Sequence, residues 1–169
     1  MIAPTRRSRL PFLLLLSVLI ITLDRITKLW VAGHIPIGGA RVVIPNVFRI
    51  THVLNSGAAF SLFAESANLN TVRWFLIAFS VTAALLVLAF LIKIGSRFTA
   101  TTVALALILG GAIGNLYDRI RLASVTDFLE VHILHYHWPD FNCADSAIVV
   151  GGILLLIESL RPQPTTKDE

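Results

Sequence analysis

The sequence predicts a mainly α-helical integral membrane protein, with four transmembrane helices and a small extracytoplasmic β-sheet between the first and second helices. The composition supports this fold class, because 56% of the 169 residues are hydrophobic and the mean hydropathy is +0.79. Charged residues make up only 14% of the chain, whereas soluble domains average about 25%. Apolar stretches of membrane-spanning length alternate with short polar segments, so we expect a single membrane domain over residues 1–169.

The first predicted span covers about residues 10–33 and contains two opposite charges. Asp24 and Lys28 are four residues apart with the acid first, which is the favourable order for an ion pair on a helix. The pair is either purely structural or lines a polar site near the outer membrane face. The sequence leaves both interpretations open.

Residues 34–68 are the least membrane-like part of the first half and predict the small sheet. Residues 42–44 and 47–54 are rich in β-branched and aromatic side chains and flank Pro45-Asn46, a pattern typical of two short strands around a turn. We expect this sheet to lie on the outer membrane surface. Small residues follow after Asn55, where they permit a tight turn or the close approach of another backbone.

The second and third spans differ in the polar residues they carry. The second, about residues 72–92, is interrupted by no ionisable side chain except Arg73 at its start, and we expect it to be scaffold. The third, about residues 98–118, contains Gly110 and Gly114 in a G-x-x-x-G motif that lets helices pack closely. Packing does not explain the polar residues at the same end: Asn115, Asp118 and Arg119.

Three histidines occur in the polar and aromatic segment 120–140, which we place outside the membrane. His132, His135 and His137 form H-x-x-H-x-H, a spacing that suggests zinc. The sequence lacks an H-E-x-x-H motif, and the aromatic neighbours are typical of an interfacial belt. We therefore interpret the histidines as interfacial residues and expect no metal.

The fourth predicted span covers about residues 141–160, and four spans place both termini on the same side. On that side seven Lys and Arg residues flank the spans, against five on the other side. Three of the seven form a cluster before the first span, at Arg6, Arg7 and Arg9. This distribution predicts cytoplasmic termini, so the sheet and the polar ends of the third and fourth spans face outward.

Acidic residues collect at this outer edge: Asp24, Asp118, Asp127, Glu130, Asp140 and Asp145. The sequence contains no nucleophile elbow, phosphate-binding loop or dinucleotide fingerprint, and Cys143 is the only cysteine. Two carboxyls in a low-dielectric site cannot easily both ionise, so Asp127 and Asp145 could share a proton and activate water. Physical reasoning leaves two alternatives open, a small transporter or channel with intramembrane charges and a helix-capping role for Asp145.

Five short motifs occur in order along the chain: D-x-x-x-K (Asp24 to Lys28), N-x-G-A-A-F (Asn55 to Phe60), G-G-A-x-G-N-x-x-D-R (Gly110 to Arg119), V-x-D-F (Val125 to Phe128) and F-N-x-A-D (Phe141 to Asp145). With these motifs the chain resembles the bacterial lipoprotein signal peptidases, also called signal peptidase II or prolipoprotein signal peptidase. The resemblance implies an aspartic endopeptidase of the bacterial inner membrane. Such enzymes remove the signal peptide from diacylglyceryl-modified prolipoproteins by cleaving before the lipidated cysteine.

The resemblance also implies partners. These are the lipid-modified prolipoprotein signal peptide and membrane lipids, with inhibitors of the globomycin type. It implies no cofactor, no metal and no nucleic acid, and we expect a monomer.

The resemblance assigns catalysis to Asp127 and Asp145. It assigns substrate binding or support of the site to nine further positions: Asp24, Lys28, Asn55, Gly57, Gly111, Asn115, Arg119, Asn142 and Ala144. Asp145 lies in the first turn of the last predicted helix, where the helix dipole favours an ionised acid, so we expect Asp127 to hold the proton.

One position departs from the family pattern, because Arg25 stands where the family usually has Gln. On a helix Arg25 is rotated by about 100° from Asp24. We therefore expect Arg25 to face the lipid headgroups and to leave the site intact.

Overall fold

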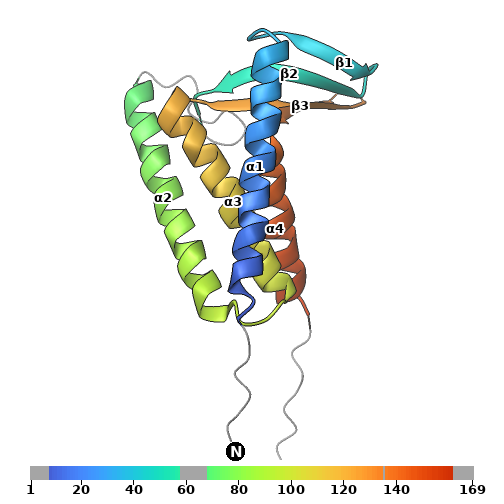
Figure 1. Ribbon diagram of the computed structural model, residues 1–169. Helices are drawn as coiled ribbons and strands as arrows, with labels where there is room; N and C mark the ends of the chain where they lie inside the picture. The colour runs from blue at the N-terminus through green and yellow to red at the C-terminus, as the bar shows by residue number, and fades with distance from the viewer. Residues whose placement is uncertain (1–7, 58–67, 135, 162–169) are drawn as a thin grey trace, which may run out of the picture.

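The computed structural model describes residues 8–57, 68–134 and 136–161. Its helices are α1 (Leu10–His34), α2 (Leu69–Ile94), α3 (Ala100–Leu122) and α4 (Cys143–Ser159). Its strands are β1 (Ala40–Ile44), β2 (Phe48–Asn55), β3 (Val125–Ile133) and β4 (Tyr136–Phe141). The helices lie side by side, and the sheet crosses the end of the bundle at which α1 and α3 finish and α4 begins (Figure 1).

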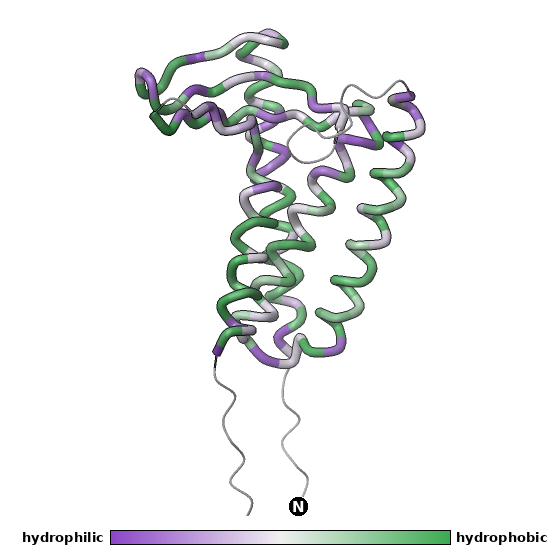
Figure 2. The backbone as a smooth tube through the Cα atoms, turned by 180° about the vertical axis from the view of Figure 1, so that it is seen from behind, coloured by the Kyte–Doolittle hydropathy of each residue, from purple (hydrophilic) through white to green (hydrophobic). Residues whose placement is uncertain are grey.

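Among the described residues, three helices are long and apolar enough to cross a membrane: Leu10–His34, Asn70–Ile94 and Ala100–Leu122. Apolar residues dominate the middle of the bundle, and polar residues concentrate toward its two ends (Figure 2). The helix in the place of the expected fourth span, α4, has 17 residues. At 1.5 Å per residue it is about 25 Å long, somewhat less than a bilayer core of about 30 Å. A mainly helical membrane protein with a small sheet is thus confirmed.

The sheet is antiparallel and has four strands in the order β1-β2-β3-β4. Its first two strands come from the segment in which the sequence predicted strands. The other two come from residues 125–141, for which we predicted no strand. The pattern there is obscured because Thr126, Asp127 and Glu130 are polar yet buried, so the polar residues do not mark the solvent side.

Helix α3 contacts each of the other three helices, and small residues let it approach two of them closely. A Cβ added at Gly110 would lie 2.8 Å from the backbone oxygen of Ser17 in α1. The Ser17 hydroxyl donates a hydrogen bond of 2.7 Å to the carbonyl of Ala106, which ties the same two helices. On the α4 side, a Cβ added at Gly151 would lie 2.8 Å from the backbone oxygen of Ala104.

This packing predicts that Gly151→Ala destabilises the protein, because the added methyl group has no space against α3. The expected loss in the free energy of unfolding is about 1–3 kcal/mol, the usual cost of overpacking. Gly152→Ala is the matched control, since a Cβ there meets nothing within 4 Å and the two changes alter the same helix equally. Thermal unfolding of the purified protein in detergent measures both variants, and equal midpoints would contradict this account of the α3–α4 contact.

Candidate active site

Asn142 brings Asp127 of β3 and Asp145 of α4 together. Its side-chain amide donates a hydrogen bond of 2.8 Å to Asp127 Oδ1, and its backbone N–H donates one of 3.2 Å to Asp145 Oδ2. Its side-chain oxygen accepts a bond of 2.9 Å from the backbone N–H of Asp145. Asn142 is completely buried and Asp127 is only 3% exposed. One residue therefore contacts both carboxyls, Asp127 through its side chain and Asp145 through its backbone N–H.

The reciprocal bonds between Asn142 and Asp145 also start helix α4, as a capping box. The capping role that the sequence allowed for Asp145 is thus present. The cap occupies only Oδ2 of Asp145. The other oxygen, Oδ1, accepts a hydrogen bond of 2.7 Å from the side-chain amide of Asn115.

Neutral amides contact both oxygens of each carboxyl. Asn55 donates a bond of 3.0 Å to Asp127 Oδ2, on the side opposite the bond from Asn142. Asn142 also donates to Asn115 Oδ1, at 3.1 Å, so the three asparagines form one connected set. Amide donors hold the carboxyl groups in place without cancelling their charge, which leaves the pair able to exchange protons.

Buried charges from α1 and α3 support Asn115. The Lys28 ammonium lies 2.8 Å from Asp24 Oδ2, 3.0 Å from Asp118 Oδ2 and 3.1 Å from Asn115 Oδ1. The ammonium thus forms two ion pairs and one hydrogen bond. The Asp24–Lys28 pair allowed by the sequence therefore forms, and it reaches the candidate site through Asn115.

Backbone contacts connect this charged group to α4 and to the sheet. Asp24 Oδ1 accepts a bond of 3.1 Å from the N–H of Ala144, and Asp118 Oδ2 accepts one of 3.2 Å from the N–H of Thr126. Ala144 is fully buried, and a Cβ added at Gly111 would collide with its carbonyl oxygen. Glycine at position 111 thus lets α3 come close enough for the asparagine contacts to form.

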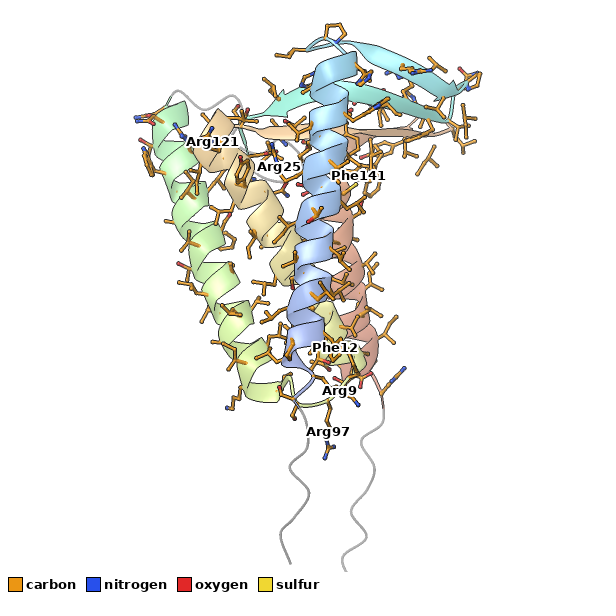
Figure 3. The ribbon with its side chains drawn as sticks, in the orientation of Figure 1. Arg9, Phe12, Arg25, Arg97, Arg121 and Phe141 are labelled. Atoms are coloured by element: carbon orange, nitrogen blue, oxygen red, sulfur yellow. The ribbon has the colours of Figure 1, made fainter. Side chains whose placement is uncertain are left out.

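The expectation that Arg25 faces the lipid headgroups is wrong. Arg25 points from α1 toward α3 (Figure 3), where its guanidinium lies 2.8 Å from Asp118 Oδ1 and 4.4 Å from the centre of the Tyr117 ring. The physical reason is charge balance. Lys28 alone cannot neutralise both Asp24 and Asp118, and a buried acid without a counter-charge is costly.

Arg119 lies at the edge of the site, and one of its donors has no acceptor among the described residues. Its Nη2 lies 3.5 Å from the carbonyl oxygen of Gly57, whose N–H is held by the side chain of Asn55 at 2.9 Å. Among the described residues nothing accepts a hydrogen bond from its buried Nε. The rest of the second motif, Ala58 to Phe60, lies outside the described residues.

The environment of Asp127 favours its protonated form. Burial, together with the negative charge of Asp145, raises the pKa of Asp127 to about 7 from a usual value of 3.8. A carboxyl with such a pKa can donate a proton at neutral pH while its partner accepts one. That Asp127 rather than Asp145 holds the proton stays a prediction.

Sequence reasoning missed a second group of ionisable residues, on the sheet. Glu130 forms a bidentate ion pair with Arg49 and also contacts His132 and His137. Only the register reveals this group, since His132 and His137 are cross-strand neighbours in β3 and β4. The remaining histidine of the H-x-x-H-x-H pattern, His135, lies outside the described residues.

Known proteins similar to this chain share one description. The model of the signal peptidase (SPase) II family matches residues 16–161. The lipoprotein signal peptidase of Pseudomonas aeruginosa is 42% identical over 157 residues, which cover 92% of this chain and 91% of the relative. That of Syntrophus aciditrophicus is 42% identical over 145 residues, covering 86% of this chain and 89% of the relative.

Solved structures agree with the fold. A bacterial membrane enzyme determined by the in meso method at 2.3 Å is similar with a TM-score of 0.82 and 30% identity, over 94% of this chain and 93% of that chain. Another, at 1.9 Å, has a TM-score of 0.78 and 31% identity, over 90% and 95%. None of these comparisons supports the alternative of a transporter or channel.

The raised pKa of Asp127 predicts a pH dependence of stability. The folded chain binds a proton at Asp127 up to about pH 7, whereas the unfolded chain releases it near pH 4, so this contribution to the free energy of unfolding falls as pH rises between them. Asp127→Asn should flatten that part of the profile. Denaturant unfolding of both proteins from pH 5 to pH 8 measures the difference, and parallel profiles would mean that another group titrates.

The position of Arg25 predicts that Arg25→Ala destabilises the protein by about 1–3 kcal/mol, because Asp118 loses a charged hydrogen-bond donor. Arg25→Gln is the matched variant. It provides a hydrogen-bond donor without the charge, so it should lose less stability than Arg25→Ala. Thermal unfolding in detergent ranks the three proteins. Identical midpoints would fit an Arg25 side chain in the headgroups and would contradict its contact with Asp118.

Proposed function

Because the chain belongs to the signal peptidase II family, we propose that Asp127 and Asp145 form the catalytic pair with which it removes signal peptides from prolipoproteins. The family makes the chain an aspartic-type signal peptidase, a hydrolase of lipoprotein processing. The observation that carries the assignment is the pair of contacts made by Asn142, at 2.8 Å to Asp127 and 3.2 Å to Asp145. Two-aspartate catalysis needs one protonated and one ionised carboxyl, and the raised pKa of Asp127 suits it to the protonated role.

In the proposed reaction a water molecule attacks the carbonyl carbon of the scissile peptide bond. Ionised Asp145 takes a proton from that water, while protonated Asp127 donates its proton to the carbonyl oxygen. The tetrahedral intermediate collapses when Asp145 returns its proton to the leaving nitrogen and the hydroxyl proton goes back to Asp127. The C–N bond breaks, and both aspartates regain their starting states. Asn142 keeps the two groups in place throughout, since it contacts both.

The proposed substrate is the diacylglyceryl-modified prolipoprotein, cleaved before its lipidated cysteine. Its signal peptide must be locally unwound to expose the scissile bond, and the backbone groups freed in this way need polar partners that lipid cannot provide. Arg119 is suited to this role, because its buried Nε has no acceptor among the described residues and its Nη2 already lies near the Gly57 carbonyl. The acyl chains would lie against the apolar faces of the helices.

In the proposed topology all four helices cross the bacterial inner membrane, with both termini in the cytoplasm and the sheet outside. Arg9 and Arg97 lie at the end of the bundle away from the sheet (Figure 3), and basic residues of this kind favour the cytoplasmic side. Helix α4 is within the range of about 17–25 residues for a membrane helix. The carboxyl pair then lies close to the outer surface, where a signal peptide presents its cleavage site.

The proposal predicts that Asp127→Asn and Asp145→Asn each abolish cleavage of a purified lipidated prolipoprotein, while the protein still accumulates in the membrane. Each change keeps the shape of the side chain but removes its ability to transfer a proton. Asp140→Asn is the matched control, because it makes the same substitution on β4 outside the pair and should retain activity. Near-normal cleavage by either variant of the pair would exclude two-aspartate catalysis.

A further inference from the structure

The Glu130 group on the sheet places three metal-ligating atoms at one point. His132 Nε2 lies 3.1 Å and His137 Nε2 lies 2.5 Å from the same oxygen, Glu130 Oε1. All three donor atoms are within 4.8 Å of one another. The carboxylate is buried, with 2% of its side chain exposed, whereas the two imidazoles are 28% and 52% exposed.

We propose that Glu130, His132 and His137 bind a divalent transition-metal ion, with zinc the first candidate. Two imidazoles and a carboxylate are ligands that zinc accepts, and a fourth position remains for water. Hard ions such as Ca²⁺ and Mg²⁺ prefer sites made entirely of oxygen, so the ligand set selects against them. The H-x-x-H-x-H spacing suggested zinc through its histidines; two of them, His132 and His137, are ligands of the proposed site, and Glu130 is the third.

The strands arrange these ligands before any ion arrives. Glu130 and His132 are two residues apart on β3, and residues with this spacing share a face of a strand. His137 faces His132 across the β3–β4 pairing, and the two rings lie 5.0 Å apart. Zinc bonds of about 2.0–2.2 Å place tetrahedral donors about 3.3–3.5 Å from one another. The carboxylate oxygen lies 3.1 Å and 2.5 Å from the two ring nitrogens, and all three donor atoms lie within 4.8 Å, so side-chain movements of about 1 Å bring them to this geometry.

The surrounding charges suit a cation. Arg49 contacts both oxygens of Glu130, through Nη2 to Oε1 and through Nε to Oε2. A metal at Oε1 displaces only the first contact, and Arg49 keeps its bond to Oε2. Asp140 provides a second negative charge near Arg49, so without the ion Arg49, Glu130 and Asp140 carry a net charge of −1.

An ion can reach the group from the surface. A hollow beside it is lined by residues of the β1–β2 hairpin together with the group itself: Val42, Pro45, Asn46, Arg49 and His132. Glu130 is three residues beyond Asp127 on β3, or about 10 Å along the strand. The site is therefore separate from the carboxyl pair, and its expected effect is to fasten β3 to β4 rather than to take part in catalysis.

Zinc titration by isothermal calorimetry tests the proposal on the full chain, purified in detergent without a histidine tag. We expect one zinc ion per chain. Loss of a residue that merely orients a metal ligand usually weakens binding about 10–100-fold, so His132→Ala and His137→Ala, which remove ligands, should each weaken it at least tenfold. His137 is half exposed, so its replacement should leave the fold intact, and retained prolipoprotein cleavage checks this.

His34→Ala is the matched control, because His34 is an exposed histidine at the end of α1 whose ring stacks on Trp30. It should leave zinc binding unchanged. The proposal is overturned if the wild-type protein binds no zinc, if both sheet variants bind it as tightly as the wild type, or if His34→Ala weakens binding as much as they do.

Discussion

The Lys28 ammonium, held between Asp24 and Asp118, is the interaction on which the rest of the structure depends. A buried charge is tolerated when opposite charges compensate it, and Lys28 forms ion pairs with both acids as well as a hydrogen bond with Asn115. The acids then bind backbone groups of α4 and β3, so the cluster sets the relative positions of α1, α3, α4 and the sheet. The carboxyl pair rests on this cluster through Asn115.

Most of the fold could be predicted from the sequence because lipid imposes simple rules. Long apolar stretches predicted the ends of helices α1, α2 and α3 to within a few residues, and β-branched residues predicted strands β1 and β2. Strands β3 and β4 could not be predicted, since their buried side chains include Asp127 and Glu130, which look like surface residues in a hydropathy pattern. Burial of those acids depends on partners far away in the chain, and local patterns contain no information about them.

The members of the candidate site could be proposed from motif order, whereas their roles required geometry. Spacing alone did not show that Asn142 contacts both aspartates, because that requires β3 to lie against the start of α4. The spacing also gave the wrong direction for the Arg25 side chain. A rotation of 100° on an ideal helix describes where the Cβ points, but a long guanidinium side chain can turn back to a buried acid. The position of the guanidinium is therefore set by the buried charge of Asp118 rather than by the direction of the Cβ of Arg25.

The capping box at Asn142 has an evolutionary consequence. At most helix starts Asn, Asp and Ser are nearly equal as N-cap residues, so one can replace another with little loss of stability. Here an Asp would add a third carboxyl beside the pair, and a Ser would keep the cap but lose the amide that reaches Asp127 and Asn115. Neither replacement keeps both the cap and the amide contacts, so helix formation and the arrangement of the carboxyl pair favour the same residue at this position.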